Sequence, residues 1–268
     1  MSEGLYPGFS TADMDEIFAL TARVGAMTAV EAAVATAQAA HGWIPSSAAE
    51  AIVAACREPV SIDVLAQGWD VGTPVLPMLD ELRRRLPADV AGCLHRNLTT
   101  QDVIDTAAML LVSEALQHLG ELAAKAAAAL RVIIERSGEV ATQARSFLQP
   151  ADVTTVGFRT ARWLDQLDGV RRRLVSAETP VQLGGLVGDA MGIPDGVVDA
   201  VAAELRLHAR SPWHTDRAPM IAVVGIATDL ARWSEKVAGD VAQLVQLGEV
   251  TTRAGGSSAA AGKRNPID

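Results

Sequence analysis

Apolar residues recur at three- and four-residue spacing along most of the chain, and this spacing predicts helices rather than strands. It is clear over residues 12–41, which follow the hydroxyl residues Ser10 and Thr11, so we expect one amphipathic helix with a side-chain N-cap. Shorter helices are expected at residues 47–56, from Ser61 onward, and at residues 77–86. The first part of the chain is therefore predicted to be a set of short helices joined by loops.

Three much longer helices are predicted at residues 100–137, 156–175 and 219–250. The first of these segments has no proline and one interior glycine, Gly120. At about 1.5 Å per residue it would be roughly 50 Å long. Helices so rich in Ala, Leu and Val have too little polar surface to stand alone, so we expect a bundle that is shared between subunits.

Composition supports an all-α fold class. Hydrophobic residues make up 49% of the 268 residues and aromatic residues only 4%, so small aliphatic side chains dominate. Alanine at this density favours helices that approach one another closely. We expect a short N-terminal helical domain over residues 1–96 and a long-helix bundle domain over residues 97–268.

The net charge and the two cysteines limit which partners and which cellular compartment are expected for this chain. The net charge is −9, and the only basic runs are the arginine triplets at 83–85 and 171–173, so a nucleic-acid partner is not expected. Cys56 and Cys93 have no metal-ligand spacing, which favours a reduced, cytoplasmic setting. No signal peptide is visible, no apolar run reaches the ~18 residues of a membrane span, and no metal or cofactor is expected.

Polar segments lie at the predicted ends of the long helices. They read LHRNLTTQD (94–102), ARSFLQPADVTTVG (144–157), PVQLGG (180–185), SPWHTDR (211–217) and GGSSAAAGKRNPID (255–268). Unpaired amides and the helix dipole favour anions at helix N-termini, so these segments predict one composite anion site. Capping and turn chemistry is the alternative for each segment alone. The glycines of LGGLVG (183–188) have neither a preceding strand nor a Walker lysine, and close helix approach explains them better than phosphate binding.

Three of these segments, in order, resemble the conserved regions of the fumarase/aspartase superfamily. HRNLTTQD at 95–102 is similar to H-x-G-x-T-S-x-D, and RSFLQPADVTTVG at 145–157 is similar to G-R-T-H-x-Q-x-A-x-P-x-T-x-G. GSSAAAGKRNP at 256–266 is similar to the signature G-S-S-x-M-P-x-K-x-N-P. Residues 10–45 and PWHTDR at 212–217 are similar to the bacterial 3-carboxy-cis,cis-muconate cycloisomerase branch. Phe147 stands where the lyases usually carry a catalytic histidine, and that branch often lacks this histidine too.

The resemblance implies roles for particular residues. Ser257 would be the general acid/base, with Ser258 as its rival. His95 could donate a proton or bind a carboxylate, and a structural hydrogen-bonding role is its alternative. A serine hydroxyl is a weak base unaided, and Lys263 is the cation available to assist it. Substrate oxygens would be bound by Thr99, Thr100, Arg145, Gln149, Lys263 and Asn265. For the two threonines, N-capping is an alternative that does not exclude binding, and PWHTDR could equally be a cap with an internal Asp216–Arg217 pair.

The reaction implied is addition to, or elimination from, a carbon next to a carboxylate. The leading expectation is lactonisation of 3-carboxy-cis,cis-muconate by a homotetramer, in the β-ketoadipate pathway of aromatic catabolism. A lyase that releases fumarate from a succinyl adduct is the alternative. A non-catalytic homologue is a third, because Ala260 and Ala261 replace the signature's Met-Pro and the chain closes two residues after Pro266, where the family usually continues.

Overall fold

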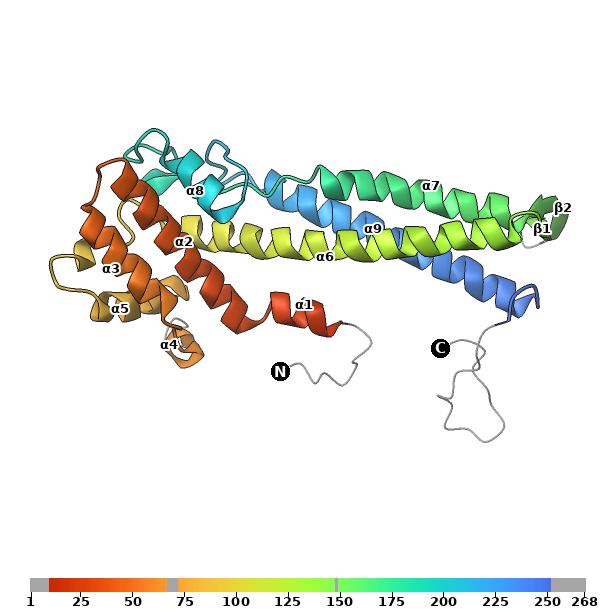
Figure 1. Ribbon diagram of the computed structural model, residues 1–268, viewed down its shortest axis with the longest axis horizontal. Helices are drawn as coiled ribbons and strands as arrows, with labels where there is room; N and C mark the ends of the chain where they lie inside the picture. The colour runs from red at the N-terminus through yellow and green to blue at the C-terminus, as the bar shows by residue number, and fades with distance from the viewer. Residues whose placement is uncertain (1–9, 67–71, 148, 252–268) are drawn as a thin grey trace. The chain divides into compact units, whose positions relative to one another are not determined.

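The computed structural model describes residues 10–66, 72–147 and 149–251 (Figure 1). The described chain forms two compact units. Unit 1 comprises the described residues up to 118 together with 177–223, and unit 2 comprises 119–176 together with those from 224 onward. The long helix α6 (Thr100–Ser137) therefore contributes residues to both units. The domain boundary predicted at residue 96 stays a prediction.

Unit 1 is built from short helices together with the first half of α6. Its elements are α1 (Ala12–Ile17), α2 (Leu20–Ala40), α3 (Ser46–Arg57), α4 (Ile62–Ala66), α5 (Val75–Arg85), the 3-10 turns η3 (Ala91–Cys93) and η4 (Gly185–Val187), α8 (Val197–Leu205) and residues 218–223 of α9 (Ala218–Gln246). The helix α2 packs against both α3 and α8 (Figure 1). Small side chains at Ala26, Ala33 and Ala37 are buried on α2 and allow this close approach.

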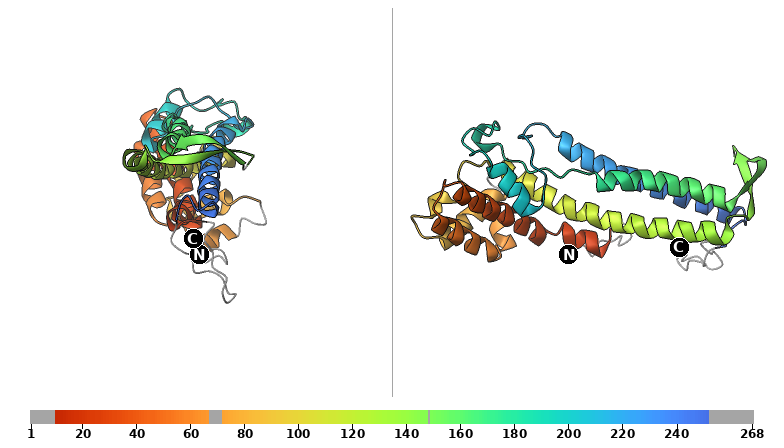
Figure 2. Two further views of the ribbon diagram at one scale, coloured as in Figure 1. Left: turned by 90° about the vertical axis from the view of Figure 1, so that its right-hand side faces the viewer. Right: turned by 45° about the horizontal axis from the view of Figure 1, so that its top comes forward.

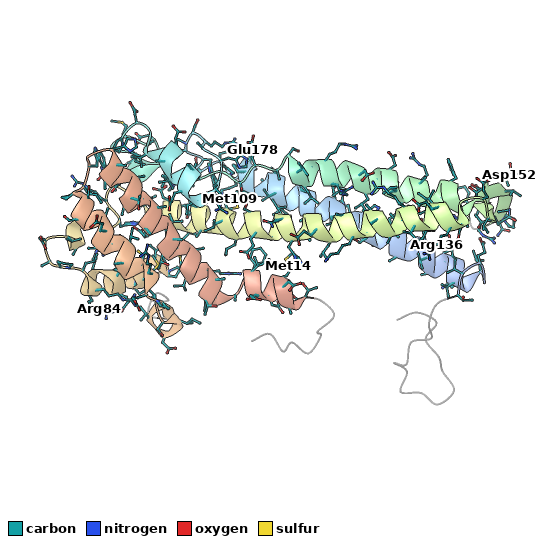
Figure 3. All side chains as sticks on the ribbon, viewed as in Figure 1. Met14, Arg84, Met109, Arg136, Asp152 and Glu178 are labelled. Atoms are coloured by element: carbon teal, nitrogen blue, oxygen red, sulfur yellow. The ribbon has the colours of Figure 1, made fainter. Side chains whose placement is uncertain are left out.

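A continuous hydrophobic core fills unit 1. Its buried members come from α1, α2, α3, α5, the first half of α6, the segment 181–207, Trp213 and a few loop residues. Met109 of α6 is fully buried within it (Figure 3). The region predicted to be a set of short helices thus folds around one shared core.

The helix predicted over residues 12–41 is interrupted. Thr11 caps α1 as expected, accepting a hydrogen bond from the Met14 amide at 3.4 Å, but α1 ends at Ile17 and α2 begins at Leu20 behind Ala19. Ala19 has extended backbone and its side chain makes no cap hydrogen bond. The prediction of one helix was therefore wrong, because apolar spacing alone does not reveal a two-residue break between helices of the same pattern.

Unit 2 is an antiparallel arrangement of long helices with a β-hairpin. It contains residues 119–137 of α6, β1 (Ala141–Ser146), β2 (Gln149–Thr155), α7 (Val156–Val175) and residues 224–246 of α9. Within the unit these helices lie side by side in both figures (Figures 1 and 2). Arg173 pairs with Asp229, while Trp163 near the other end of α7 binds Asp240, so α7 and α9 run in opposite directions.

The predicted long helices are confirmed. α6 and α7 have the bounds expected from the sequence, and α9 begins one residue earlier and ends four residues earlier than expected. The all-α class is confirmed apart from the hairpin, which was not predicted. In the described part of the chain, no helix is both long and apolar enough to cross a membrane.

The hairpin is fixed to the start of α7. Thr155 caps α7 by accepting a hydrogen bond from the Phe158 amide at 3.1 Å. The Gly157 amide donates to the Gly138 carbonyl at 3.1 Å, and a Cβ on Gly157 would lie 2.7 Å from that same oxygen. Only glycine allows this approach, so the family-like Gly157 sets the end of α6 against the beginning of α7.

Asp102 in the first turn of α6 joins three segments of unit 1. Its fully buried carboxylate accepts hydrogen bonds from the Gln182 side chain at 3.1 Å and from the amides of Gly184 at 2.8 Å and Gly185 at 3.0 Å. It also accepts the Thr99 amide at 3.1 Å, so Asp102 caps its own helix.

The glycines of residues 183–188 were predicted to allow helices to approach closely, but their role in unit 1 is different. Gly185 has φ +69°, and a Cβ there would lie 3.2 Å from the Asn97 carbonyl oxygen. Gly184 has no room for a side chain beside Gly188. These residues form a turn whose amides enclose the Asp102 carboxylate.

We predict that Asp102→Ala lowers the free energy of unfolding by about 3 kcal/mol or more, because several buried donors lose their acceptor together. Urea unfolding followed by circular dichroism measures the change. Asp80→Ala is the control: this carboxylate is 70% exposed in an i,i+3 pair with Arg83, and its loss should cost under about 1 kcal/mol. Equal shifts in the two variants would contradict the role assigned to Asp102.

Candidate functional site

The turn before α6 holds the first candidate residues of unit 1. The imidazole Nδ1 of His95 lies 2.6 Å from Oε1 of Glu31, a residue of α2 that is 1% exposed. His95 itself has φ 59°, which an L-residue rarely adopts. A buried carboxylate and an unusual backbone conformation therefore both fix the direction of this ring.

Asn97 occupies the position where the family pattern has glycine. Its φ is 56°, and asparagine tolerates the left-handed region better than most other non-glycine residues. Its side-chain amide donates to the Gly192 carbonyl at 2.9 Å. The substitution thus keeps the turn that presents His95 and ties it to the loop after η4.

Thr99 and Thr100 lie at the N-terminus of α6, and both are half-buried. The cap is made by Asp102, whose carboxylate accepts the Thr99 amide, and whose own amide donates to the Thr99 carbonyl at 3.0 Å. The first amides of a helix have no partner within it, and the dipole favours a negative charge nearby. Part of this helix end is therefore already occupied by the Asp102 carboxylate, with Thr99 and Thr100 beside it.

A second ionic contact braces the same helix. Arg217 donates to both oxygens of Asp105, at 2.6 and 2.9 Å, and its guanidinium lies 5.3 Å from the centre of the Trp213 ring. The internal Asp216–Arg217 pair considered for PWHTDR is wrong, because Asp216 instead accepts the Ala218 amide at the start of α9. Arg217 is therefore occupied in holding α6 and the entry to α9 together.

The second group of candidate residues lies on the hairpin of unit 2. Arg145 is on β1 and pairs with Glu249 at 3.3 Å, while Gln149 is the exposed first residue of β2. Phe147, where lyases of the family usually have histidine, is at the hairpin tip with φ 48° and 98% of its surface exposed. Arg145 was predicted to bind substrate oxygens, which stays a prediction; within unit 2 its ionic partner is Glu249.

The Glu249 carboxylate is stabilised in its charged form. The Thr142 hydroxyl donates to it and, together with the contact to Arg145, lowers the pKa of Glu249 below its ordinary value of 4.5. The charge of Arg159 acts in the same direction. The chain just after α9 is thereby attached to β1.

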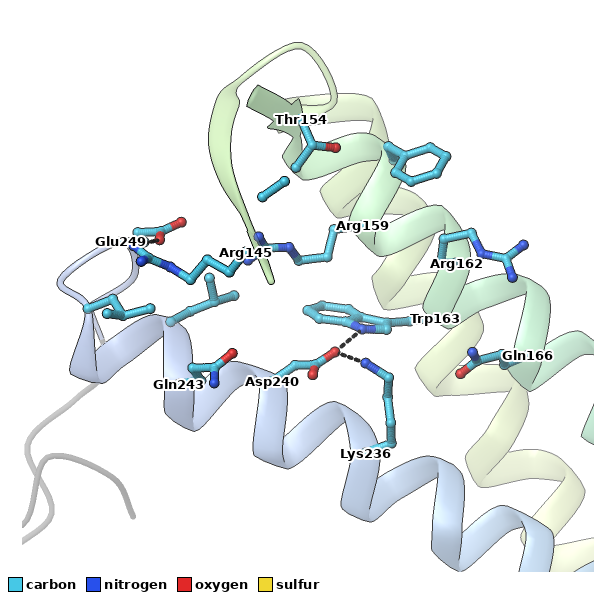
Figure 4. A pocket seen from close by; sticks show the side chains of 14 residues that line it. Arg145, Thr154, Arg159, Arg162, Trp163, Gln166, Lys236, Asp240, Gln243 and Glu249 are labelled. Carbon is cyan, nitrogen blue, oxygen red and sulfur yellow. Dashed lines mark hydrogen bonds and ion pairs between the residues drawn. The ribbon is translucent and has the colours of Figure 1, made fainter. Parts of the chain in front are cut away.

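Unit 2 contains a cavity of about 360 Å³ between the hairpin, α7 and the end of α9 (Figure 4). Its described lining residues are Ala144, Arg145, Thr154, Phe158, Arg159, Arg162, Trp163, Gln166, Lys236, Asp240, Gln243, Leu244, Leu247 and Glu249. Figure 4 shows Arg145 and Arg159 above the Trp163 ring, with Asp240 opposite. The cavity is thus cationic above an apolar floor.

The candidate residues therefore fall into separate groups. The structure brings His95, Thr99 and Thr100 together in unit 1, and it brings Arg145 and Gln149 together in unit 2. Ser257, Lys263 and Asn265, with Ser258, lie outside the described residues. Within the described ranges, no group of three or more His, Cys, Asp and Glu side chains is placed to hold a metal ion.

Sequence reasoning missed several residues that the structure brings to these groups. Glu31 is 64 positions from His95, and Asp105 is 112 positions from Arg217, so no local spacing indicates either pair. Arg159 could have been noticed, because it follows the RSFLQPADVTTVG segment by two residues and faces the same cavity as Arg145.

Comparison with known proteins identifies the family. The family described as lyase matches residues 9–268, nearly the whole chain. The chain belongs to this lyase family. Its resemblance to the fumarase/aspartase superfamily, noted from three short segments, is thereby confirmed over the full chain.

Individual relatives of this lyase family member differ in the reaction they are named for. A nitrosuccinate lyase from Streptomyces davaonensis is 34% identical over 91% of the chain and 57% of its own length. A 3-carboxy-cis,cis-muconate cycloisomerase from Acinetobacter baylyi is 31% identical over 97% of the chain and 62% of its own length. The chain therefore spans about three fifths of the length of these relatives.

Solved structures agree with the family assignment. The crystal structure of the 3-carboxy-cis,cis-muconate lactonizing enzyme from Pseudomonas putida superposes with a TM-score of 0.86 at 28% identity, covering 98% of this chain and 62% of that one. The long-helix architecture of the lyase family is thus present in this chain.

We predict that Thr142→Val raises the pKa of Glu249 towards 4.5, because the donated hydrogen bond is its main stabilising contact. A depressed folded-state pKa adds stability that is fully present above pH 4.5 and is lost as the pH falls through the folded value. The variant should lack this contribution, so its stability should fall less than that of the native chain on acidification through that window. Carboxyl-carbon NMR titration measures the pKa. Thr154→Val, opposite Thr142 in the hairpin register, is the control. An unchanged Glu249 pKa in Thr142→Val would contradict the assignment.

Proposed function

We propose that the chain forms part of an enzyme acting at the carbon next to a carboxylate, and that its reaction is lactonisation of 3-carboxy-cis,cis-muconate. One substrate carboxylate oxygen adds to a carbon of the conjugated diene. The displaced π electrons move onto the neighbouring carboxylate as an aci-carboxylate, and a general acid then delivers a proton to the α carbon. Atoms and charge balance without a metal or cofactor.

The observation that carries this proposal is the fixed imidazole of His95 at the entry to α6. Glu31 holds Nδ1 at 2.6 Å, which leaves Nε2 as the nitrogen able to meet a substrate. A preorganised donor is effective because it needs no reorientation as negative charge develops. Thr99 and Thr100 follow at the helix end that favours an anion, so binding and proton transfer have neighbouring candidates.

The remaining roles follow from the family pattern. Ser257 would deliver or accept the α proton, assisted by Lys263, with Asn265 binding substrate oxygens. A Gly- and Ser-rich loop can close over a bound substrate and exclude water. Arg145 and Gln149 would bind further carboxylate oxygens from the hairpin.

A complete site would be assembled from several copies of the chain. Members of the superfamily combine their conserved regions from different chains of a homotetramer, and we propose the same assembly here, in the cytoplasm. Exposed apolar side chains on the unit 2 helices support the assembly, among them Leu122, Val132, Ile133, Phe158 and Val224. The free thiols of Cys56 and Cys93 suit a reduced compartment.

A substituted succinate is the second candidate substrate. The relative from Streptomyces davaonensis at 34% identity is named a nitrosuccinate lyase. Removal of a proton from the CH2 carbon next to the nitro-bearing carbon would give the same kind of carboxylate-stabilised carbanion, whose electron pair forms the double bond of fumarate as nitrite departs. The same residues would serve both reactions, with proton removal in place of proton delivery.

We predict that the purified chain decreases the ultraviolet absorbance of 3-carboxy-cis,cis-muconate, because lactonisation breaks the conjugated diene. Ser257→Ala should lower kcat by about 10²–10⁴-fold while KM changes little. Nitrite release from nitrosuccinate, followed colorimetrically, tests the second candidate in parallel. A Ser257→Ala variant as fast as the native chain would remove that serine from the mechanism. Silence with both substrates would overturn the proposal.

We predict that His95→Asn lowers kcat/KM by at least about 100-fold, because the positioned proton donor is lost. Asparagine tolerates the left-handed backbone at this position, so the turn should survive. His118→Asn is the matched control, because His118 lies on α6, the helix that follows His95, and faces the exposed Asp13 at 3.6 Å. Equal activity of the two variants would argue that His95 only braces Glu31.

A further inference from the structure

The cavity of unit 2 has more positive charge than the proposed mechanism uses. Its cationic lining residues are Arg145, Arg159, Arg162 and Lys236, and its anionic ones are Asp240 and Glu249. Only Arg145 belongs to the family segments discussed above. The question is which of these cations is already neutralised.

Two of the cations have carboxylates within the cavity. Arg145 pairs with Glu249, whose position is also fixed by Thr142. Lys236 pairs with Asp240 one turn along α9. Their charge is therefore largely balanced by the cavity wall itself.

Asp240 also accepts a hydrogen bond from the Trp163 indole at 2.7 Å. Both contacts are to the same oxygen, Oδ2, and among the described residues Asp240 forms an ion pair with Lys236 alone. The dashed lines of Figure 4 mark these two contacts of Asp240.

Arg159 is different. Its guanidinium donates to the backbone carbonyl of Gln143 at 3.0 Å, and among the described residues no carboxylate lies within ion-pair distance of it, although its charge also acts on Glu249. Arg162, one turn further along α7, pairs with Asp165, and both side chains are more than half exposed. Arg159 is half-buried, so its charge is screened less by water than that of Arg162.

The surroundings of Arg159 suit a small organic anion rather than a bare ion. Phe158, Trp163, Leu244 and Leu247 supply apolar surface to the cavity. A volume of about 360 Å³ falls in the range of small-molecule sites. The planar guanidinium can bind both oxygens of a carboxylate, and the hairpin carbonyl already fixes its orientation.

We propose that Arg159 anchors a binding site in this cavity for a carboxylate group of a small polycarboxylate. The choice of a polycarboxylate rests on the proposed function, whereas the anion site rests on the cavity and its charges. In that function, Arg159 would hold a carboxylate that takes no part in the bond changes and would select for substrates with an additional acidic group.

Direct binding tests the site without turnover. Tricarballylate, a saturated tricarboxylate that cannot react, is titrated calorimetrically into the full native chain, Arg159→Gln and Arg172→Gln. We expect Arg159→Gln to weaken binding at least tenfold, because a charge-assisted contact is lost. Arg172→Gln removes the same charge from an exposed position of the same helix and should bind within about twofold of the native chain.

A folding defect is distinguished by Arg159→Lys, which keeps the charge without the planar fork and should bind with intermediate affinity. Native-like binding by Arg159→Gln, or absence of binding by the native chain, overturns the inference. Arg159-dependent binding in a chain that is silent in both activity assays would leave the anion site standing and remove the proposed function. Turnover of either substrate without Arg159-dependent binding would leave the proposed function standing and remove the anion site.

Discussion

Unit 1 depends on the hydrogen bonds that the buried Asp102 carboxylate accepts. It caps α6 through Thr99 and receives the amides of the glycine turn at 184 and 185, so one buried group orients a helix, a loop and the turn that carries His95. Burying a carboxylate is costly unless donors surround it. The glycines are needed because backbone amides can converge on a carboxylate only where no side chain stands in the way.

The helices of unit 2 are held together by other kinds of contact. Its helices expose many apolar side chains, and its polar contacts, such as the indole of Trp163 on Asp240, lie at helix–helix boundaries. The hairpin adds little buried surface, but through Gly157 and Thr155 it fixes where α7 begins. Arg145 and Arg159 are thereby presented to one cavity from adjoining elements.

The elements predictable from the sequence were those with continuous periodicity and few helix-breaking residues. The bounds of α6 and α7 follow from such stretches, whereas the hairpin of residues 141–155 does not alternate apolar and polar residues, because neither of its faces is buried in a core. The nine-residue α8 follows a glycine-rich stretch and was missed.

For the candidate site, segment patterns could indicate His95, Thr99, Thr100, Arg145 and Gln149. They could not indicate Glu31, because its pairing with His95 exists only after α2 has folded against the turn before α6. The same holds for Asp105, which looked like one more polar residue of a long helix until Arg217 met it. Long-range ion pairs of this kind depend on tertiary structure and carry no local spacing.

Trp163 both lines the cavity and joins α7 to α9, and this constrains which residues can change during evolution. Its indole forms part of the cavity floor, its Nε1 holds Asp240, and its carbonyl accepts the Trp233 indole at 2.9 Å. Replacing it to reshape the cavity would loosen α7 from α9. Divergence in ligand preference should therefore proceed through residues such as Arg159 and Gln243, which line the same space without joining the two helices.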